Sequence, residues 1–272
     1  MGVKSTNDKF YTNPIIVDKL LDCLNLMKYD LIIEPSAGNG SFSNKIIKNK
    51  NNLISLDIEP EDSYIQKQNW FDYKVPVEYK KVLILGNPPF GINNKLSMDF
   101  IKHSLSFDNV TTIAFILPNV FNKHTKQKIF PQEWKLVRVI ELPKNSFLLN
   151  NEEYHVPCSF YIWTKEFSIT DLRFDFEKYQ YHNDFNIIKN KNDFNKSDFF
   201  VMGSNPANVL KVREVNKNNR GYYIKVNGNI SEVINNFRNI KWNEVGNSSA
   251  SGGVSWFSQP ELIYFYDKYK KV

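Results

Sequence analysis

The residues from Ile84 to Gly91 read ILGNPPFG, an apolar run that ends in an amide, two prolines and an aromatic ring. Prolines fix the backbone and remove amide donors, so we expect Asn87 and Phe90 in a rigid turn at the end of a strand. Such a turn can hold two acceptors still, the side-chain oxygen of Asn87 and the main-chain carbonyl of Pro88. An exocyclic amine on a base needs such help, because its lone pair is delocalised into the ring.

Two acceptors placed against the two N–H bonds of that amine would draw its nitrogen toward tetrahedral geometry and aim the lone pair at a methyl donor. The aromatic residue would stack on the base and keep it in plane. The sequence thus predicts a catalytic tetrapeptide of Asn87, Pro88, Pro89 and Phe90. A proline-rich turn that only closes a strand is the structural alternative.

A second group of residues suits a cofactor. EPSAGNGSF, residues 34–42, follows an apolar strand, and its Gly38-x-Gly40 pair permits a tight turn close to a ligand. A further acid, Asp57, ends the next strand and suits a ribose diol. Because Glu34 would repel a pyrophosphate, a ligand with a ribose and a positive charge fits better. S-adenosylmethionine, whose sulfonium and ammonium groups favour nearby carboxylates, is such a ligand.

The elements that position these residues alternate between strand and helix patterns. The predicted strands are residues 31–35, 53–57, 82–87, 112–118, 136–143 and 158–163, and the predicted helices are 15–27, 41–48 and 95–105. This alternation predicts an α/β fold with an open, doubly wound, mostly parallel sheet, whose ligands lie at the carboxyl ends of the strands. Glu34, Asp57 and Asn87 each end a predicted strand, so we expect all three on one rim.

From residue 166 onward the pattern changes to shorter elements and asparagine-rich turns, which predicts a smaller α+β module over residues 166–272 after a domain over residues 1–165. We expect a hairpin over 208–226, a helix near 231–240 and a final helix from Ser258, capped by Glu261. Basic and tyrosine side chains of the hairpin fit contact with phosphates, although an ordinary charged hairpin is the alternative. These side chains are Lys211, Arg213, Lys217, Arg220, Tyr222, Tyr223 and Lys225.

EPSAGNGSF, LDIEP and GNPPFG, in this order and with these gaps, resemble the S-adenosylmethionine-dependent adenine-N6 methyltransferases. The arrangement is similar to the gamma-class DNA enzymes, in which a Rossmann-like catalytic domain precedes a target-recognition domain. The resemblance covers about residues 10–165. It implies methyl transfer to adenine N6 in DNA, with the target base flipped out of the duplex.

The resemblance also implies roles for individual residues. FYTNP, residues 10–14, matches the family's N-terminal cofactor motif, so Tyr11–Thr12 would approach the methionine end of the cofactor. The family places an acid after the third strand, which here corresponds to Asn69 or Asp72, and that choice stays open. Phe147 either corresponds to the aromatic residue that packs on the flipped base or is a core residue. The implied cofactor-binding residues are Tyr11, Thr12, Glu34, Ala37, Gly38, Gly40, Asp57, Asn69, Trp70, Asp72 and Asn87.

Composition narrows the class of protein further. A hydrophobic content of 42% is that of a globular protein, and no apolar run approaches the roughly 20 residues needed to cross a bilayer. Cys23 and Cys158 form neither a disulfide framework nor a zinc site, and the four histidines lack metal spacing. We therefore expect a cytoplasmic protein that uses no metal. The net charge of +6 permits DNA or RNA as a partner without requiring either.

Three other functions share part of this pattern. An RNA adenine-N6 methyltransferase would use the same tetrapeptide, and only the recognition module would separate the two polymers. A protein glutamine-N5 methyltransferase faces the same lone-pair problem, but that group usually carries a helical domain first, whereas here the first cofactor motif begins by residue 10. A catalytically inactive nucleic-acid-binding module is disfavoured, because the tetrapeptide and the glycines are intact.

Overall fold

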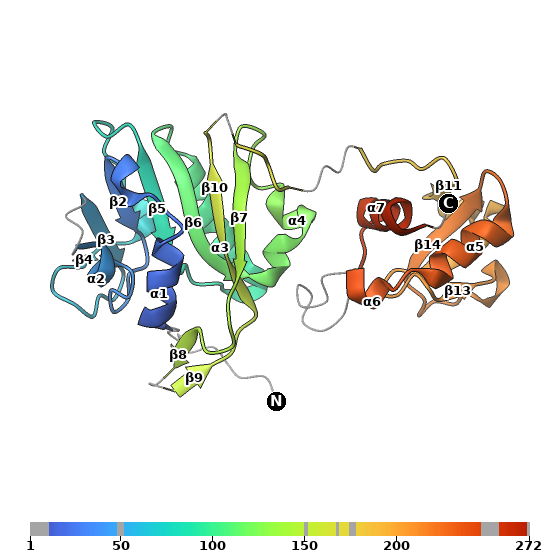
Figure 1. Ribbon diagram of the computed structural model, residues 1–272, viewed down its shortest axis with the longest axis horizontal. Coiled ribbons are helices and arrows are strands. Elements are labelled where there is room, and N and C mark those ends of the chain that lie inside the picture. Colours follow the sequence, from blue (N-terminus) through green and yellow to red (C-terminus); the bar gives the residue numbers. More distant parts are fainter. Residues whose placement is uncertain are drawn as a thin grey trace. The chain divides into compact units, whose positions relative to one another are not determined.

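The computed structural model describes residues 11–47, 52–149, 152–166, 169–173, 178–245 and 256–270. The chain divides into two compact units, Met1–Arg173 and Phe174–Val272, and each has a hydrophobic core of its own (Figure 1). The segment 169–173, which the sequence analysis assigns to the second module, belongs to the first unit. Its Leu172 amide donates a hydrogen bond to the Leu136 carbonyl at 2.7 Å.

A seven-stranded sheet organises the first unit, in the order β4-β3-β2-β5-β6-β10-β7. The first five strands of this order are mutually parallel, and β10 runs antiparallel to both β6 and β7. The α/β class predicted from the sequence, with a doubly wound and mostly parallel sheet, is confirmed. The strands are β2 (Leu31–Glu34), β3 (Leu53–Asp57), β4 (Gln66–Lys67), β5 (Val82–Gly86), β6 (Val110–Pro118), β7 (Lys135–Glu141) and β10 (Cys158–Thr164).

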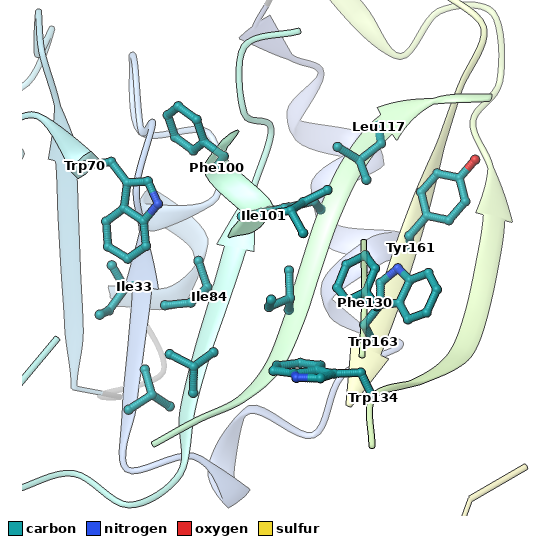
Figure 2. Close-up of a cluster of buried hydrophobic side chains, with 14 of the residues drawn as sticks. Ile33, Trp70, Ile84, Phe100, Ile101, Leu117, Phe130, Trp134, Tyr161 and Trp163 are labelled. Carbon is teal, nitrogen blue, oxygen red and sulfur yellow. The ribbon is translucent and has the colours of Figure 1, made fainter. Parts of the chain in front are cut away.

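Helices cover both faces of this sheet. α1 (Pro14–Leu21) and α2 (Ser43–Ile46) pack on one face, toward which Ile32 of β2 points. α3 (Lys95–Leu105) packs on the other face, where the next strand residue, Ile33, lies among aromatic and aliphatic side chains (Figure 2). Successive strand residues point to opposite faces, so a strand that is covered on both sides must be apolar throughout.

The helix ends follow local signals in part. The Asn13 side chain accepts a hydrogen bond from the Ile15 amide at 3.1 Å, and Pro14 opens α1. The helix ends at Leu21 and not at Met27, since residues 26–28 form a separate 3-10 turn. α3 has the predicted bounds, whereas α2 is shorter than predicted. The short turns of this unit are η1 (Leu26–Lys28), η3 (Trp70–Asp72), η4 (Ile92–Asn94), η5 (Asn119–Asn122) and α4 (His124–Gln127).

A small antiparallel sheet joins two distant segments of the first unit. β1 (Tyr11–Thr12) pairs with β8 (Phe147–Leu149), which in turn pairs with β9 (Glu152–Tyr154). Thr12 lies opposite Phe147 in this register. The N-terminal cofactor motif is therefore fixed beside the segment that follows β7.

The second unit is an antiparallel sheet in the order β11-β14-β12-β13, with helices on one face. The predicted α+β class and the two predicted helices are confirmed, and both the Ser258 amide and its hydroxyl lie 2.7 Å from the Glu261 carboxylate. The elements are β11 (Phe185–Ile188), η6 (Lys191–Lys196), β12 (Phe199–Met202), β13 (Val209–Leu210), η7 (Val212–Glu214), β14 (Gly221–Val226), α5 (Ile230–Asn239), α6 (Trp242–Val245) and α7 (Gln259–Tyr269).

The prediction of a hairpin over residues 208–226 is wrong. β13 and β14 do not pair with each other, because β12 lies between them and pairs with both. After Leu210 the chain leaves the sheet through η7, where the Glu214 carboxylate accepts a hydrogen bond from the Lys211 amide at 3.1 Å. Lys211 and Arg213 therefore do not share a strand face.

Candidate functional site

The carboxyl ends of three neighbouring parallel strands form the rim that the sequence singles out. β3, β2 and β5 lie side by side, and they end at Asp57, Glu34 and Gly86, with Asn87 directly after the last. The rim is thus built from residues more than 50 positions apart in the chain. It brings together the acids and the tetrapeptide on which the sequence analysis depends.

Glu34 is the most buried member of this rim, with 2% of its surface exposed. Its carboxylate accepts hydrogen bonds from the Ser43 amide, at 2.9 Å, and from the Ser43 hydroxyl, which also lies 2.6 Å from the hydroxyl of Ser55. Burial raises the pKa of Glu34 to about 8, and the charge of Asp57 acts in the same direction, whereas the bonds from Ser43 oppose the shift. At neutral pH this carboxyl therefore carries a proton most of the time.

Glu34 also lies directly beside the end of β5. Gly86 has a φ of 143°, and a Cβ atom built on it would lie 3.3 Å from the Glu34 Cγ atom. A second contact joins the same segments, since the Ser36 hydroxyl donates to the Asn87 carbonyl at 3.3 Å. The glycine-rich loop and the tetrapeptide are consequently one connected structure.

Asp57 joins the glycine-rich loop to the end of β3. One carboxylate oxygen accepts the Gly38 amide and the other accepts the Glu59 amide, both at 2.8 Å. Gly38 needs this anchor because its φ of 54° is a conformation that residues with a side chain rarely adopt. Each carboxylate oxygen retains a further lone pair, so Asp57 can also accept hydrogen bonds from a ligand diol.

Tyr11 lies over the glycine turn. A Cβ atom on Gly38 would be 3.4 Å from the Tyr11 ring, and the Tyr11 hydroxyl donates a hydrogen bond to the Glu61 carboxylate. The Glu61 amide in turn donates to the Gly38 carbonyl at 3.2 Å. Thr12, the next residue in the predicted cofactor motif, is buried in β1. Of this pair, Tyr11 is the residue that the structure places against the glycine-rich loop.

The tetrapeptide is held by hydrogen bonds to its carbonyl groups. Besides the Ser36 contact to Asn87, the Ser97 hydroxyl donates to the Pro89 carbonyl at 3.1 Å and the Ser97 amide donates to the Phe90 carbonyl at 3.4 Å. Within the described part of the chain, no hydrogen bond reaches the carbonyl of Pro88. Hydrogen bonds to three carbonyls thus fix the turn. The fold does not use the fourth, the Pro88 carbonyl, which the sequence analysis assigns as an acceptor for the amine.

The side chains of the tetrapeptide differ in burial. Asn87 is half-buried and its Oδ1 atom is enclosed, Pro88 is buried and Pro89 is exposed. Phe90 is half-buried and packs against the core on the α1 side of the sheet. Phe90 is therefore anchored on one side while part of its surface remains accessible.

Two aromatic residues named from the sequence lie in the core. Phe147 and Trp70 are each 1% exposed, on opposite faces of the sheet. The indole of Trp70 packs against Tyr73 and His103. Phe147 takes the structural role that the sequence left open, and Trp70 packs among apolar side chains, so neither ring has a free face for a ligand.

The turn after β4 contains both residues between which the resemblance does not decide. The Asn69 side-chain oxygen accepts the Phe71 amide at 3.1 Å and so caps η3. Asp72, at the other end of that turn, is exposed. Asn69 already has a structural task, whereas the Asp72 carboxylate faces solvent.

Sequence reasoning missed three residues that hold this rim together. They are Ser36, Ser43 and Glu61, whose bonds reach the Asn87 carbonyl, the Glu34 carboxylate and the Tyr11 hydroxyl. Ser36 lies in the loop that follows Glu34 and Ser43 is the first residue of α2, and a hydroxyl at either place is a natural partner for a carboxylate or a carbonyl. Their positions after Glu34 were the available signal, while the Glu61 contact depends on tertiary structure alone.

The residues predicted to bind nucleic acid lie in different environments in the second unit. Tyr222 points into the core and its hydroxyl donates to the Phe257 carbonyl at 2.7 Å, whereas Tyr223 points to the other face and stacks on Phe194 with a ring separation of 3.8 Å. Lys225 pairs with Asp198 at 3.0 Å. All five cations of the set are exposed, and four of them, Lys211, Arg213, Lys217 and Arg220, lie between β13 and β14.

Neither a metal site nor a membrane-spanning helix is present among the described residues. They contain no group of three or more histidine, cysteine or acidic side chains that could hold a metal ion. In the same part of the chain, no helix has the length and apolar character required to cross a membrane.

No model of a known protein family matches the chain. The ribosomal RNA small subunit methyltransferase A of Ureaplasma parvum serovar 3 is 21% identical over 173 residues, which make up 56% of this chain and 62% of that protein. The chain therefore spans less than two thirds of the length of that relative.

Solved structures with a similar fold are more distant in sequence. A putative RNA methyltransferase from Pyrococcus horikoshii is 14% identical with a TM-score of 0.45, over 61% of this chain and 93% of that one. A modification subunit of a putative type I restriction enzyme from Vibrio vulnificus YJ016 is 11% identical with a TM-score of 0.42, over 59% of this chain and 45% of that one. Likeness at this level carries no argument about the substrate of this chain.

Proposed function

We propose that the protein transfers a methyl group from S-adenosylmethionine to the exocyclic N6 amine of adenine in DNA. The observation that carries the proposal is the use of carbonyl groups in the tetrapeptide. Those of Asn87, Pro89 and Phe90 accept hydrogen bonds from serines, whereas none from the described residues reaches Pro88. In this proposal the Pro88 carbonyl, which the fold leaves unused, would serve as an acceptor held by a fixed turn.

In this proposal the tetrapeptide activates the amine. The Asn87 side-chain oxygen, which is enclosed in the free protein, would turn toward the base to accept one N–H bond, and the Pro88 carbonyl would accept the other, which would concentrate the lone pair on nitrogen. The cofactor supplies a methyl group bonded to a positively charged sulfur. The N–C bond would form as the S–C bond breaks, which would leave a neutral thioether, and the nitrogen would then lose a proton to solvent. The accessible part of Phe90 stacks on the base, whose extrusion from a duplex is required for access.

The residues of the rim fit the proposed cofactor. Asp57 would accept hydrogen bonds from the ribose, and its charge would favour a cation, as would Glu34 when its carboxyl is ionised. Gly38 has no side chain beneath the Tyr11 ring, and a Cβ atom on Gly86 would be pressed against Glu34. Both glycines therefore allow Tyr11 and Glu34 to approach the backbone closely at the proposed cofactor site. Ala37 and Gly40 complete the turn, and we assign to Asp72 the role of accepting a bond from the adenine of the cofactor, since the Asn69 side chain caps η3.

The division of the chain suggests how the polymer would be bound. We assign catalysis to the first unit and target recognition to the second, whose exposed cations between β13 and β14 would contact phosphates. An RNA adenine-N6 methyltransferase is the second candidate. The observation that favours it is the sequence similarity to a ribosomal RNA methyltransferase.

The test is methyl transfer to matched polymers. The protein is incubated with S-adenosylmethionine carrying a labelled methyl group and with an unmethylated duplex DNA or an RNA of the same sequence. Each polymer is then digested to nucleosides and analysed by mass spectrometry. Label in N6-methyldeoxyadenosine supports the proposal, label only in N6-methyladenosine from RNA supports the second candidate, and label in neither contradicts both.

A further inference from the structure

The turn directly after the tetrapeptide carries an exposed aliphatic side chain. Ile92 is 81% exposed and lies two residues beyond Phe90. A solvent-exposed isoleucine is unfavourable in the free protein, although single examples occur on most protein surfaces. Its position beside the catalytic residues is what requires an explanation.

The backbone of this turn is unusual. Asn93 and Asn94 both have positive φ values, 54° and 61°, and Gly91 before Ile92 has a φ of 67°. Asparagine and glycine are the residues that adopt this conformation most readily, although two residues with side chains in succession are uncommon. The residue types of this turn therefore suit its backbone conformation.

Contacts on both sides hold the turn in one conformation. The Asn94 amide donates to the Gly91 carbonyl at 3.2 Å, and the Lys126 ammonium reaches the Asn93 carbonyl at 3.5 Å. A side chain on Gly91 would meet the Leu96 Cβ atom at 2.8 Å, so only glycine fits there. Ile92 is therefore presented on a rigid support and not on a loose loop.

We infer that Ile92 is a wedge that enters a nucleic-acid duplex and fills the space left by the flipped target base. Apolar side chains that insert between base steps are a general means of distorting a duplex. A β-branched side chain suits the task, because it has few rotamers to lose on insertion. Exposed Lys95, three residues on, and Lys126 provide positive charge beside the wedge, where the phosphates of the opened strand would lie. This inference rests on the proposed function.

The chain offers a matched control for this residue. Val77 is also a β-branched aliphatic residue and is 89% exposed, but it lies in the segment that leads into β5, away from the tetrapeptide in sequence. Truncating either side chain removes a similar apolar group from the surface. Only truncation of Ile92 is expected to change how the protein handles a duplex.

The experiment compares transfer of labelled methyl groups to a long unmethylated duplex DNA with transfer to the same DNA after heat denaturation. For Ile92→Ala the ratio of duplex to single-stranded rate should fall about tenfold or more, because nothing then stabilises the vacated stack. Ile92→Leu should restore most of that ratio, and Val77→Ala should leave it unchanged. Thermal unfolding of each variant checks that the fold is kept.

An unchanged ratio for Ile92→Ala, or an equal fall for Val77→Ala, overturns the wedge while leaving the proposed function intact. If the wild-type protein labels neither form of the DNA, the DNA function fails first and the wedge fails with it. The wild-type reaction therefore distinguishes the two failures.

Discussion

The main-chain amide of Gly38 donates a hydrogen bond of 2.8 Å to the carboxylate of Asp57, which joins the glycine turn to the end of the neighbouring strand. The second oxygen of the same carboxylate accepts the Glu59 amide at 2.8 Å. One side chain thus sets the turn that the cofactor would approach and also supplies acceptors for a ribose. Asp57 therefore holds the glycine turn in place and is also the proposed ribose-binding residue.

Asp57→Asn should therefore weaken cofactor binding. The amide nitrogen of asparagine would face a main-chain N–H group, and the negative charge would be lost, so we expect the dissociation constant of S-adenosylmethionine to rise about tenfold or more. Isothermal titration calorimetry measures this directly. Asp62→Asn, the same change in an exposed acid of the following loop, is the control and should have no effect. Equal affinity in the Asp57 variant and the wild-type protein would remove Asp57 from the site.

The raised pKa of Glu34 leads us to expect that cofactor binding releases protons. Its pKa is raised to about 8, so at pH 7 the carboxyl is mostly protonated in the cofactor-free protein. A positively charged cofactor binds the ionised form more tightly, and binding at pH 7 should release part of a proton. The release should vanish at a pH well above 8, where the carboxyl is already ionised. Calorimetry in buffers of different ionisation enthalpy measures the release, which should be absent in Glu34→Gln.

The same shift has a consequence for stability. An acid whose folded-state pKa is raised above its unfolded value holds its proton better in the folded protein, so its contribution is largest at low pH. That contribution declines between the unfolded value of 4.5 and about 8. As the pH rises from about 4.5 to about 8, the Glu34→Gln variant should therefore lose less stability than the wild-type protein. Identical pH dependence of the two melting temperatures would show that the carboxyl is not buried as described.

Gly40 tests the backbone of the cofactor loop. Its φ of 77° disfavours any side chain, and a Cβ atom there would overlap the Tyr64 hydroxyl. We expect Gly40→Ala to lower the free energy of unfolding by about 2 kcal/mol, with strain and overlap combined. Adding Tyr64→Ala should relieve only the overlap. Gly228→Ala is the control, because no atom lies within 4 Å of the Cβ position there. Thermal unfolding should show no loss for this control.

The sequence predicts the fold better than it predicts the contacts of the site. Continuous apolar runs and the alternation of elements are local patterns, and they predict the strands that end at Glu34, Asp57 and Gly86. The pairing of β12 with both β13 and β14 is a long-range choice that no local pattern encodes, so the predicted hairpin fails. Strand alternation does predict that Tyr222 and Tyr223 point to opposite faces. Burial of Phe147 and Trp70 depends on which elements cover them, which a motif cannot report.

The second unit makes a prediction about salt dependence. Lys217 and Arg220 are exposed between β13 and β14, whereas Lys225 is paired with Asp198 in the sheet. If the first two contact phosphates, Lys217→Gln and Arg220→Gln should each lower the slope of log affinity for DNA against log salt by about 1. Lys225→Gln, the matched control, should leave the slope unchanged. Binding titrations at several salt concentrations give the slopes, and a change confined to Lys225→Gln would reverse the assignment.

The most direct test of the proposed chemistry is methyl transfer by Asn87→Ala, measured together with the dissociation constant of S-adenosylmethionine. Loss of one rigid acceptor should lower the transfer rate by at least about 100-fold, while cofactor affinity stays within about threefold of the wild-type value. That separation of catalysis from binding is the result predicted by the role of the tetrapeptide. A variant that binds the cofactor and transfers methyl groups at a near-normal rate would contradict it.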